Sequence, residues 1–184
     1  MRIIAGKFRG RIISSPNSKY TRPMTDRLRV TLFDILSNKI DFDGIKVLDL
    51  YSGSGSIGLE ALSRGAEKVD FIEKNLSISK TLLKNIESLN VSDRCKIFKM
   101  EALKFSRMEE HDNYDLIFAD PPFFKDDIYE VVENLLANNF LMEDGKIIVQ
   151  RSIQSKEKDK LHFETEPFKV VGDSCLYDIV NRKL

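Results

Sequence analysis

The chain has 184 residues, within the usual size range of one domain, and its 42% hydrophobic content is enough for an ordinary core. Its 29 basic and 29 acidic residues balance, no apolar run could span a bilayer, and the N-terminus lacks a signal peptide's apolar core, so we expect one cytoplasmic domain over residues 1–184 without a membrane partner. Two separated cysteines and two histidines, without a Cys/His cluster, argue against a disulfide framework and a metal site.

The positive charge is concentrated at the start of the chain. Residues 1–29 hold eight basic side chains and one acidic, a net of +7, whereas the remaining 155 residues hold 21 basic and 28 acidic, a net of −7. A basic N-terminus favours a polyanionic partner such as nucleic acid, because binding of basic side chains to phosphates releases counterions. A solvated tail has the same composition. Apolar residues around Gly6 and Gly10 predict a hairpin that packs on the domain. We therefore predict that residues 1–24 form a basic extension that contacts nucleic acid.

The following segments alternate between helix and strand patterns. Thr25 or Asp26 can cap a helix that continues to about Leu36. Apolar runs predict strands at residues 46–50, 68–72, 96–99, 114–119 and 145–150, and helical spacing predicts helices at 77–89 and 126–139. An antiparallel pair, 168–172 and 176–180, follows the charged segment 155–160, which is expected to be a loop without a role. The alternation predicts an α/β fold with a doubly wound, mostly parallel sheet.

A glycine-rich loop follows the first predicted strand. Residues 51–58 read Tyr-Ser-Gly-Ser-Gly-Ser-Ile-Gly, and a helical apolar pattern comes next. Gly53 and Gly55 leave room for the backbone to approach a ligand, and the start of a helix offers free N–H groups. The glycines at 53, 55 and 58 also have the GxGxxG spacing of dinucleotide sites, with Glu73 twenty residues after Gly53. A nicotinamide or flavin cofactor therefore fits this pattern.

Two features favour S-adenosylmethionine over a dinucleotide. Asp49 closes the strand four residues before Gly53, where its carboxylate suits a methionine ammonium, directly or through water, and is badly placed for a diphosphate. A dehydrogenase also needs a catalytic domain, for which little chain remains. Glu73 can accept from ribose hydroxyls of either cofactor, so it does not discriminate. Glu101 ends the third predicted strand, where it can accept from an adenine amine or be a surface carboxylate.

The segment Asp120-Pro121-Pro122-Phe123 is typical of a site for a planar amine. It follows the buried strand 114–119, so it lies at the edge where open α/β sheets bind ligands. The Asp120 carboxylate and the Pro121 carbonyl can each accept one N–H of an exocyclic amine, Phe123 can stack on the base, and the prolines fix the backbone. A strand-ending turn has a similar composition. The glycine loop upstream makes methyl transfer the better interpretation.

Five segments spread over nearly the whole chain carry a family resemblance. They are RIIAGKFRGR at 2–11, TRPMTDRLRVTLFDIL at 21–36, LDLYSGSGSIGLEALSRGA at 48–66, FIEKN at 71–75 and DPPF at 120–123. In this order they resemble the RsmD family of bacterial 16S ribosomal RNA guanine-N2 methyltransferases. The chain departs from the family pattern at Met24, where Thr is usual, and at Glu101, where Asp is usual.

The resemblance implies a Rossmann-like methyltransferase fold with a mostly parallel seven-stranded sheet, an antiparallel C-terminal strand and an N-terminal β-hairpin. It implies a monomer that uses S-adenosylmethionine, without a metal, to methylate 16S ribosomal RNA, free or in the assembled small subunit. The implied catalytic residues are Asp120, Pro121, Pro122 and Phe123. The implied cofactor-binding residues are Met24, Thr25, Asp49, Tyr51, Ser52, Gly53, Ser54, Gly55, Glu73, Lys74, Glu101, Ala102 and Asp120. The implied RNA-binding residues are Arg2, Lys7, Arg9, Arg11, Arg22 and Arg27.

Three other functions remain open on the sequence. A DPPF site also suits the amine of adenine, as in adenine-N6 or DNA methyltransferases. The GxGxxG spacing suits an NAD-dependent oxidoreductase. An RNA-binding module with a vestigial cofactor pocket would bind RNA without turnover.

Overall fold

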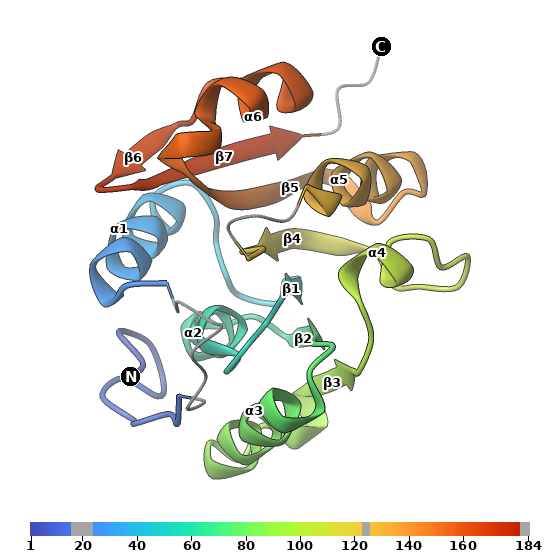
Figure 1. The fold of residues 1–184 in the computed structure, drawn as a ribbon. Coiled ribbons are helices and arrows are strands. Elements are labelled where there is room, and N and C mark those ends of the chain that lie inside the picture. The colour runs from blue at the N-terminus through green and yellow to red at the C-terminus, as the bar shows by residue number, and fades with distance from the viewer. Residues whose placement is uncertain (16–23, 123–125, 181–184) are drawn as a thin grey trace.

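The computed structural model describes residues 1–15, 24–122 and 126–180 (Figure 1). Two predicted site residues, Arg22 and Phe123, lie outside the described residues. The helices are α1 (Asp26–Ser37), α2 (Ser56–Arg64), α3 (Leu76–Ser88), α4 (Ala102–Phe105), α5 (Asp127–Ala137) and α6 (Lys156–Phe163). The strands are β1 (Lys46–Leu50), β2 (Lys68–Ile72), β3 (Cys95–Phe98), β4 (Tyr114–Ala119), β5 (Leu141–Ser152), β6 (Lys169–Val171) and β7 (Ser174–Val180). Among the described residues, no helix is long and apolar enough to cross a membrane.

The strands of the described part form one sheet in the order β3-β2-β1-β4-β5-β7-β6. Strands β1 to β5 are parallel, whereas β7 pairs antiparallel with both β5 and β6. The chain builds outward from β1 to β3 and then returns to the other side of β1 with β4. This reversal is the point where open α/β sheets bind ligands. The predicted mostly parallel, doubly wound sheet is confirmed.

Hydrophobic side chains pack on both faces of the sheet. Successive strand residues point to opposite faces, so Val47 joins the core under α1, α2 and α3, whereas Leu48 joins the core under α5 and α6. Each face of the sheet is therefore covered by its own set of helices. The N-terminal segment adds to the first of these layers, and in Figure 1 it lies beside α2 and α1.

The N-terminal segment doubles back on itself, as the sequence predicted. The N–H of Ile3 donates to the carbonyl of Arg11 and the N–H of Ile13 donates to the carbonyl of Met1, each at 3.0 Å. The ladder is reduced to a single antiparallel bridge between Arg2 and Ile12, so no regular strand forms. Ile3 and Ile13 are each 1% exposed and anchor the segment in the core.

Two parts of the chain fold differently from the sequence prediction. Residues 155–160 were predicted to be a loop without a role, but residues 156–160 form the first part of α6, and Asp159 within them is fully buried. That prediction was wrong because the charged composition suggested solvent, whereas Arg151 of β5 neutralises Asp159 at 3.0 Å. The helix α4 was missed because four residues are too few to show a helical period.

Candidate active site

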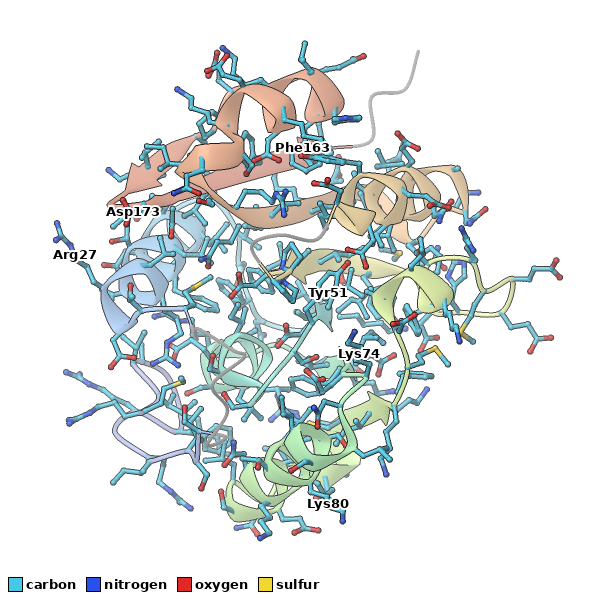
Figure 2. The ribbon with its side chains drawn as sticks, viewed as in Figure 1. Arg27, Tyr51, Lys74, Lys80, Phe163 and Asp173 are labelled. Atoms are coloured by element: carbon cyan, nitrogen blue, oxygen red, sulfur yellow. The ribbon has the colours of Figure 1, made fainter. Side chains whose placement is uncertain are left out.

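The carboxyl ends of β1, β2 and β4 lie side by side, because the last residues of these parallel strands are paired with one another. The residues that follow are the glycine loop 51–55, Glu73 and Asp120. The sheet therefore brings together three segments that are far apart in the sequence. Figure 2 shows Tyr51 and Lys74, which follow β1 and β2, near the middle of the view.

The glycine loop has a tightly fixed backbone. Tyr51, Gly53 and Gly55 have φ values of 57°, 55° and 79°, in the left-handed region that is costly for a non-glycine residue such as Tyr51. The Ser52 hydroxyl donates to the carbonyl of Asp49 at 2.5 Å, and the Ser52 N–H donates to the carbonyl of Ile72 at 3.0 Å. The loop is thus held in one conformation by both neighbouring strands.

The two loop glycines serve different purposes. A Cβ added at Gly55 would lie 2.3 Å from the Leu82 side chain and 3.3 Å from the Phe71 ring, so this glycine is required by core packing. Among the described residues, a Cβ at Gly53 would meet only the carbonyl oxygen of Tyr51, at 4.0 Å. The space over Gly53 is therefore open to a ligand. The reason given from sequence, close approach of a ligand, fits Gly53, whereas close packing explains Gly55.

Asp49 lies beneath the loop and is 1% exposed. Its Oδ2 accepts from the N–H of Gly58 at 2.9 Å, which fixes the first turn of α2. Burial raises the pKa of Asp49 well above its usual range, the Gly58 hydrogen bond opposes this shift, and the charges of Asp120 and Glu73 add to it. Three carboxyl groups thus share one small region of the site.

Glu73 ties the second strand to the glycine loop. Its Oε2 accepts from the N–H of Gly53 at 3.0 Å, and its Oε1 accepts from the N–H of Asn75 at 2.7 Å. The Asn75 side chain in turn caps α3. Lys74 lies 3.5 Å from the carboxylate of Glu101, so two further predicted site residues form an ion pair at this edge.

Asp120 follows β4 with its side chain partly buried. Burial raises its pKa to about 7, which leaves the carboxyl group poised between its two forms near neutral pH. Pro121 is buried, whereas Pro122 is exposed, so the segment turns outward between them. This arrangement offers one carboxylate for a hydrogen-bond donor near the Gly53 loop.

The start of α5 is anchored by contacts that the sequence did not suggest. Asp127, in the first turn of α5, accepts from the Tyr51 hydroxyl at 3.3 Å. Asp126 lies 2.7 Å from Lys158 of α6 and 3.9 Å from Arg151. The glycine loop and α6 therefore both hold the start of α5. No periodic signal in the sequence marks these pairs.

The remaining predicted cofactor residues have mixed surroundings. Met24 is 5% exposed within the hydrophobic core, and Thr25 caps α1 by accepting from the N–H of Leu28 at 3.2 Å. Ser54 and Ala102 are buried.

No group of three or more His, Cys, Asp or Glu side chains that could hold a metal ion occurs among the described residues.

The N-terminal segment is fastened to α2 by side chains of that helix. Glu60, fully buried, accepts from the N–H groups of Ile4 and Ala5 at 2.7 and 3.1 Å. The Ser63 hydroxyl accepts from the N–H of Phe8 at 2.9 Å. The basic side chains of this segment, at 2, 7, 9 and 11, belong to exposed residues. The backbone is therefore rigidly placed while the charges face outward.

Asn85 of α3 joins the N-terminal segment to the glycine loop. Its Oδ1 accepts from the N–H of Ser14 at 2.8 Å, and its Nδ2 donates to the carbonyls of Ser14 at 3.0 Å and Ser54 at 2.9 Å. Asn85 is 2% exposed, and its bond to Ser54 is buried, whereas its two bonds to Ser14 are partly buried. Sequence reasoning assigned no role to Asn85, because a polar residue between apolar helix positions has no distinctive pattern.

Arg29 is the largest fully buried side chain of the described residues, and sequence reasoning missed it. Its Nη2 donates to the carbonyl of Arg2 at 2.7 Å and pairs with Asp26 at 2.9 Å. Within the described part of the chain, its Nε and Nη1 have no hydrogen-bond partner. The available signal was its spacing from Phe33 and Leu36, which places it on the apolar face of α1. Arg27, by contrast, projects outward in Figure 2.

Comparison with known proteins gives a consistent set of matches. The family described as "Conserved hypothetical protein 95" matches residues 1–177. "Ribosomal RNA small subunit methyltransferase D" of Haemophilus influenzae is 36% identical over 162 residues, which cover 87% of this chain and 80% of that protein. "Putative rRNA methyltransferase YlbH" of Bacillus subtilis is 29% identical over 152 residues, which cover 82% of each.

Solved structures show the same fold over the whole chain. The structure titled "Putative methyltransferase yhhF from Escherichia coli" has a TM-score of 0.82 and 30% identity, and the match covers 99% of both chains. A hypothetical protein of Thermus thermophilus has a TM-score of 0.80 and 26% identity, with 97% of this chain and 98% of that chain covered. The predicted Rossmann-like fold is therefore confirmed.

Proposed function

This chain belongs to the family described as "Conserved hypothetical protein 95", and on that premise we propose that it transfers a methyl group from S-adenosylmethionine to the exocyclic N2 amine of a guanine in 16S ribosomal RNA. The names of its relatives in Haemophilus influenzae and Escherichia coli support methylation of small-subunit ribosomal RNA. The observation that carries the proposal is the position of Asp120, whose carboxyl group ends β4 beside the glycine loop of β1.

The described residues fit S-adenosylmethionine at this edge. The backbone at Gly53 is open above the loop, and the Glu73 carboxylate beside it can accept from ribose hydroxyls. Asp49 is buried against Gly58 and its pKa is raised, so its contribution to cofactor binding is to hold the glycine loop and the first turn of α2 in place. Lys74 and Glu101 border the region where an adenine would lie. When bound, the cofactor supplies a methyl group on a positively charged sulfur, and that carbon–sulfur bond breaks as the new nitrogen–carbon bond forms.

Asp120 and Pro121 position the amine. A guanine N2 amine is a poor nucleophile, because its lone pair is delocalised into the ring. A carboxylate oxygen of Asp120 accepts one N–H, the carbonyl of Pro121 accepts the other, and the lone pair is directed toward the methyl group. Such positioning contributes several kcal/mol, of order 7 to 11 in well-aligned intramolecular reactions. The methylated nitrogen carries positive charge and loses its proton readily, so no separate base is needed.

The N-terminal segment supplies the electrostatic part of RNA binding. Its basic side chains are outward-facing, whereas its backbone is held by Glu60 and Ser63. Phosphate contacts of this kind orient the substrate, and the site at Asp120 acts on the delivered base. Phe123, proposed to stack on that base, and Arg22, proposed to contact phosphate, lie outside the described residues.

A methyl-transfer assay on unmodified ribosomal RNA and on unmodified small subunits tests the proposal. We expect label from the cofactor to appear as N2-methylguanosine after digestion to nucleosides. Asp120→Asn should lower the rate by orders of magnitude with little change in cofactor affinity, because the interaction acts mainly in the transition state. Asp144→Asn, an exposed carboxylate near the start of β5, is the matched control and should keep the wild-type rate. Labelled N6-methyladenosine, or transfer to duplex DNA alone, would show that the substrate is wrong.

A further inference from the structure

The outer face of α3 carries two exposed lysines, Lys80 and Lys84, that the proposed active site does not use. They stand one helical turn apart, which places their side chains as neighbours. In Figure 2 Lys80 points away from the body of the molecule at the foot of the view. Leu76 and Leu83 on the same helix are 63% and 43% exposed, so this face has no covering layer among the described residues.

The basic N-terminal segment is docked against this same helix. The Arg11 guanidinium donates through Nη2 to the carbonyl of Ser88, the last residue of α3, at 2.6 Å. Ser14 is held by the Asn85 side chain through both of its backbone groups. Lys84 therefore lies one turn before the point where Arg11 meets the helix. The cations of the N-terminal segment and those of α3 share one continuous surface.

The charge of this surface is mostly positive and mostly uncompensated. Residues 1–15 contain Arg2, Lys7, Arg9 and Arg11 and no acidic residue, and the one acidic residue of α3 is Glu87. No ion pair between described residues includes Lys80 or Lys84. In contrast, two lysines at the amino ends of strands have acidic partners. Lys68, the first residue of β2, lies 3.9 Å from Glu67, and Lys96, the second residue of β3, lies 3.6 Å from Asp112.

We propose that the Lys80–Lys84 face of α3 extends the N-terminal segment into a track for the RNA backbone beside the target guanine. This inference rests on the proposed function and adds a contact surface to it. The helix begins directly after Asn75, which the Glu73 carboxylate holds at the edge of the active site. A strand of RNA that crosses Arg11, Lys84 and Lys80 is therefore led to that edge. Adjacent turns bring the two ammonium groups close enough to neutralise neighbouring phosphates.

RNA fits this face better than a protein partner. The exposed leucines suit a nucleobase or a protein surface equally. The two lysines form no ion pair with a described acidic residue and continue a segment with four further cations, which suits a polyanion. A ribosomal protein on the same face is the alternative outcome, and protein-free RNA distinguishes the two.

The test measures binding of the full chain to protein-free small-subunit ribosomal RNA over a series of salt concentrations. The Lys80→Gln/Lys84→Gln variant should bind more weakly, and each lost contact should reduce the slope of log affinity against log salt by up to about 0.9. Lys80→Arg/Lys84→Arg should restore both values, since charge is kept. The matched control, Lys68→Gln/Lys96→Gln, should leave both unchanged. Cofactor affinity should be the same in all four proteins.

Two results overturn the inference. One is a Gln variant with the wild-type affinity and salt slope on protein-free RNA. The other is a loss that appears only with assembled small subunits, which assigns the face to a ribosomal protein. The proposed function fails in a separate way, if the wild-type protein binds RNA with normal salt dependence and transfers no methyl group to it.

Discussion

The side-chain amide of Asn85 donates to the carbonyl of Ser54 at 2.9 Å while it also bonds both backbone groups of Ser14. One buried side chain of α3 thus joins the glycine loop to the basic N-terminal segment. Its hydrogen bonds span separations of 31 and 71 residues, so they close only in the complete fold.

Asn85→Leu should weaken both cofactor binding and stability. The change removes the hydrogen bonds to Ser14 and to the buried carbonyl of Ser54, and a buried group left unsatisfied, such as that carbonyl, costs about 1 to 3 kcal/mol. Calorimetric titration with S-adenosylmethionine or its demethylated product should show a lower affinity. Asn134→Leu is the control, because the Asn134 side chain of α5 donates to Ser106 at 3.1 Å and no hydrogen bond between described residues joins it to the glycine loop. Equal cofactor affinities in the two variants would contradict the role given to Asn85.

The rate of methyl transfer should rise with pH through about 7. Burial raises the pKa of Asp120 to about 7, and only its carboxylate form can accept an N–H of the amine. Single-turnover rates between pH 5.5 and pH 8.5 measure this, with RNA and cofactor saturating. A rate that stays flat through this interval would mean that another step limits the reaction or that Asp120 is ionised throughout.

The same carboxyl group should make the folded state less stable as pH rises. Its pKa in the folded chain lies above the unfolded value, so the folded state binds the extra proton between about pH 4 and pH 7. The free energy of unfolding therefore falls through that window, all else equal. In Asp120→Asn this contribution is absent, so the variant should gain stability relative to wild type as pH increases. Denaturant titrations at pH 5 and pH 8 would show the difference.

Gly53→Val should abolish cofactor binding, whereas Gly172→Val should not. The two glycines have φ values of 55° and 56°, and a Cβ at either would meet open space or a single distant atom, so the backbone strain is matched. Only Gly53 lies at the proposed ligand site. Thermal shift with S-adenosylmethionine should be lost in the first variant and kept in the second, and NAD should cause none in wild type. A preserved shift in Gly53→Val would place the cofactor elsewhere.

Asp159→Ala should cost about 3 kcal/mol of stability, the lower end for a broken buried pair, because it removes the nearest carboxylate of the buried Arg151 but leaves Asp126 at 3.9 Å. Asp159 also accepts from the hydroxyls of Tyr129 and Ser155 at 2.8 and 2.7 Å. Urea titration measures the loss. Glu157→Ala in the same helix removes an exposed carboxylate and should stay within about 0.5 kcal/mol of wild type.

Lys7→Gln/Arg9→Gln should weaken RNA binding without changing cofactor affinity. Both residues are exposed, and the backbone around them is fixed by Ser63, so the fold should be kept. Two lost phosphate contacts reduce the salt slope by up to about 1.8. Filter binding at several salt concentrations measures it, with circular dichroism as the check on folding. An unchanged slope would make this segment a solvated surface.

Helices and strands with a regular apolar spacing could be predicted from the sequence, whereas side-chain contacts between different elements could not. Strand β4 has the predicted bounds, and α1 is capped by Thr25 as expected, since apolar period and capping chemistry are local properties. The convergence of the glycine loop with Glu73 followed from parallel strand order. The buried Asp159 escaped prediction because its partner Arg151 comes from another element, and charge alone suggests solvent.

The buried Arg29 gives the start of the chain a second importance. Its guanidinium reaches the carbonyl of Arg2, and Ile3 and Ile13 close the core above α2. The segment that we propose to contact RNA therefore also closes one side of the hydrophobic core. Deleting or replacing this segment would uncover apolar side chains of the core and remove one hydrogen-bond partner of the buried Arg29 guanidinium. Under the proposed function, RNA preference can therefore change through single outward side chains such as Lys7 and Arg9 and not through replacement of the whole segment.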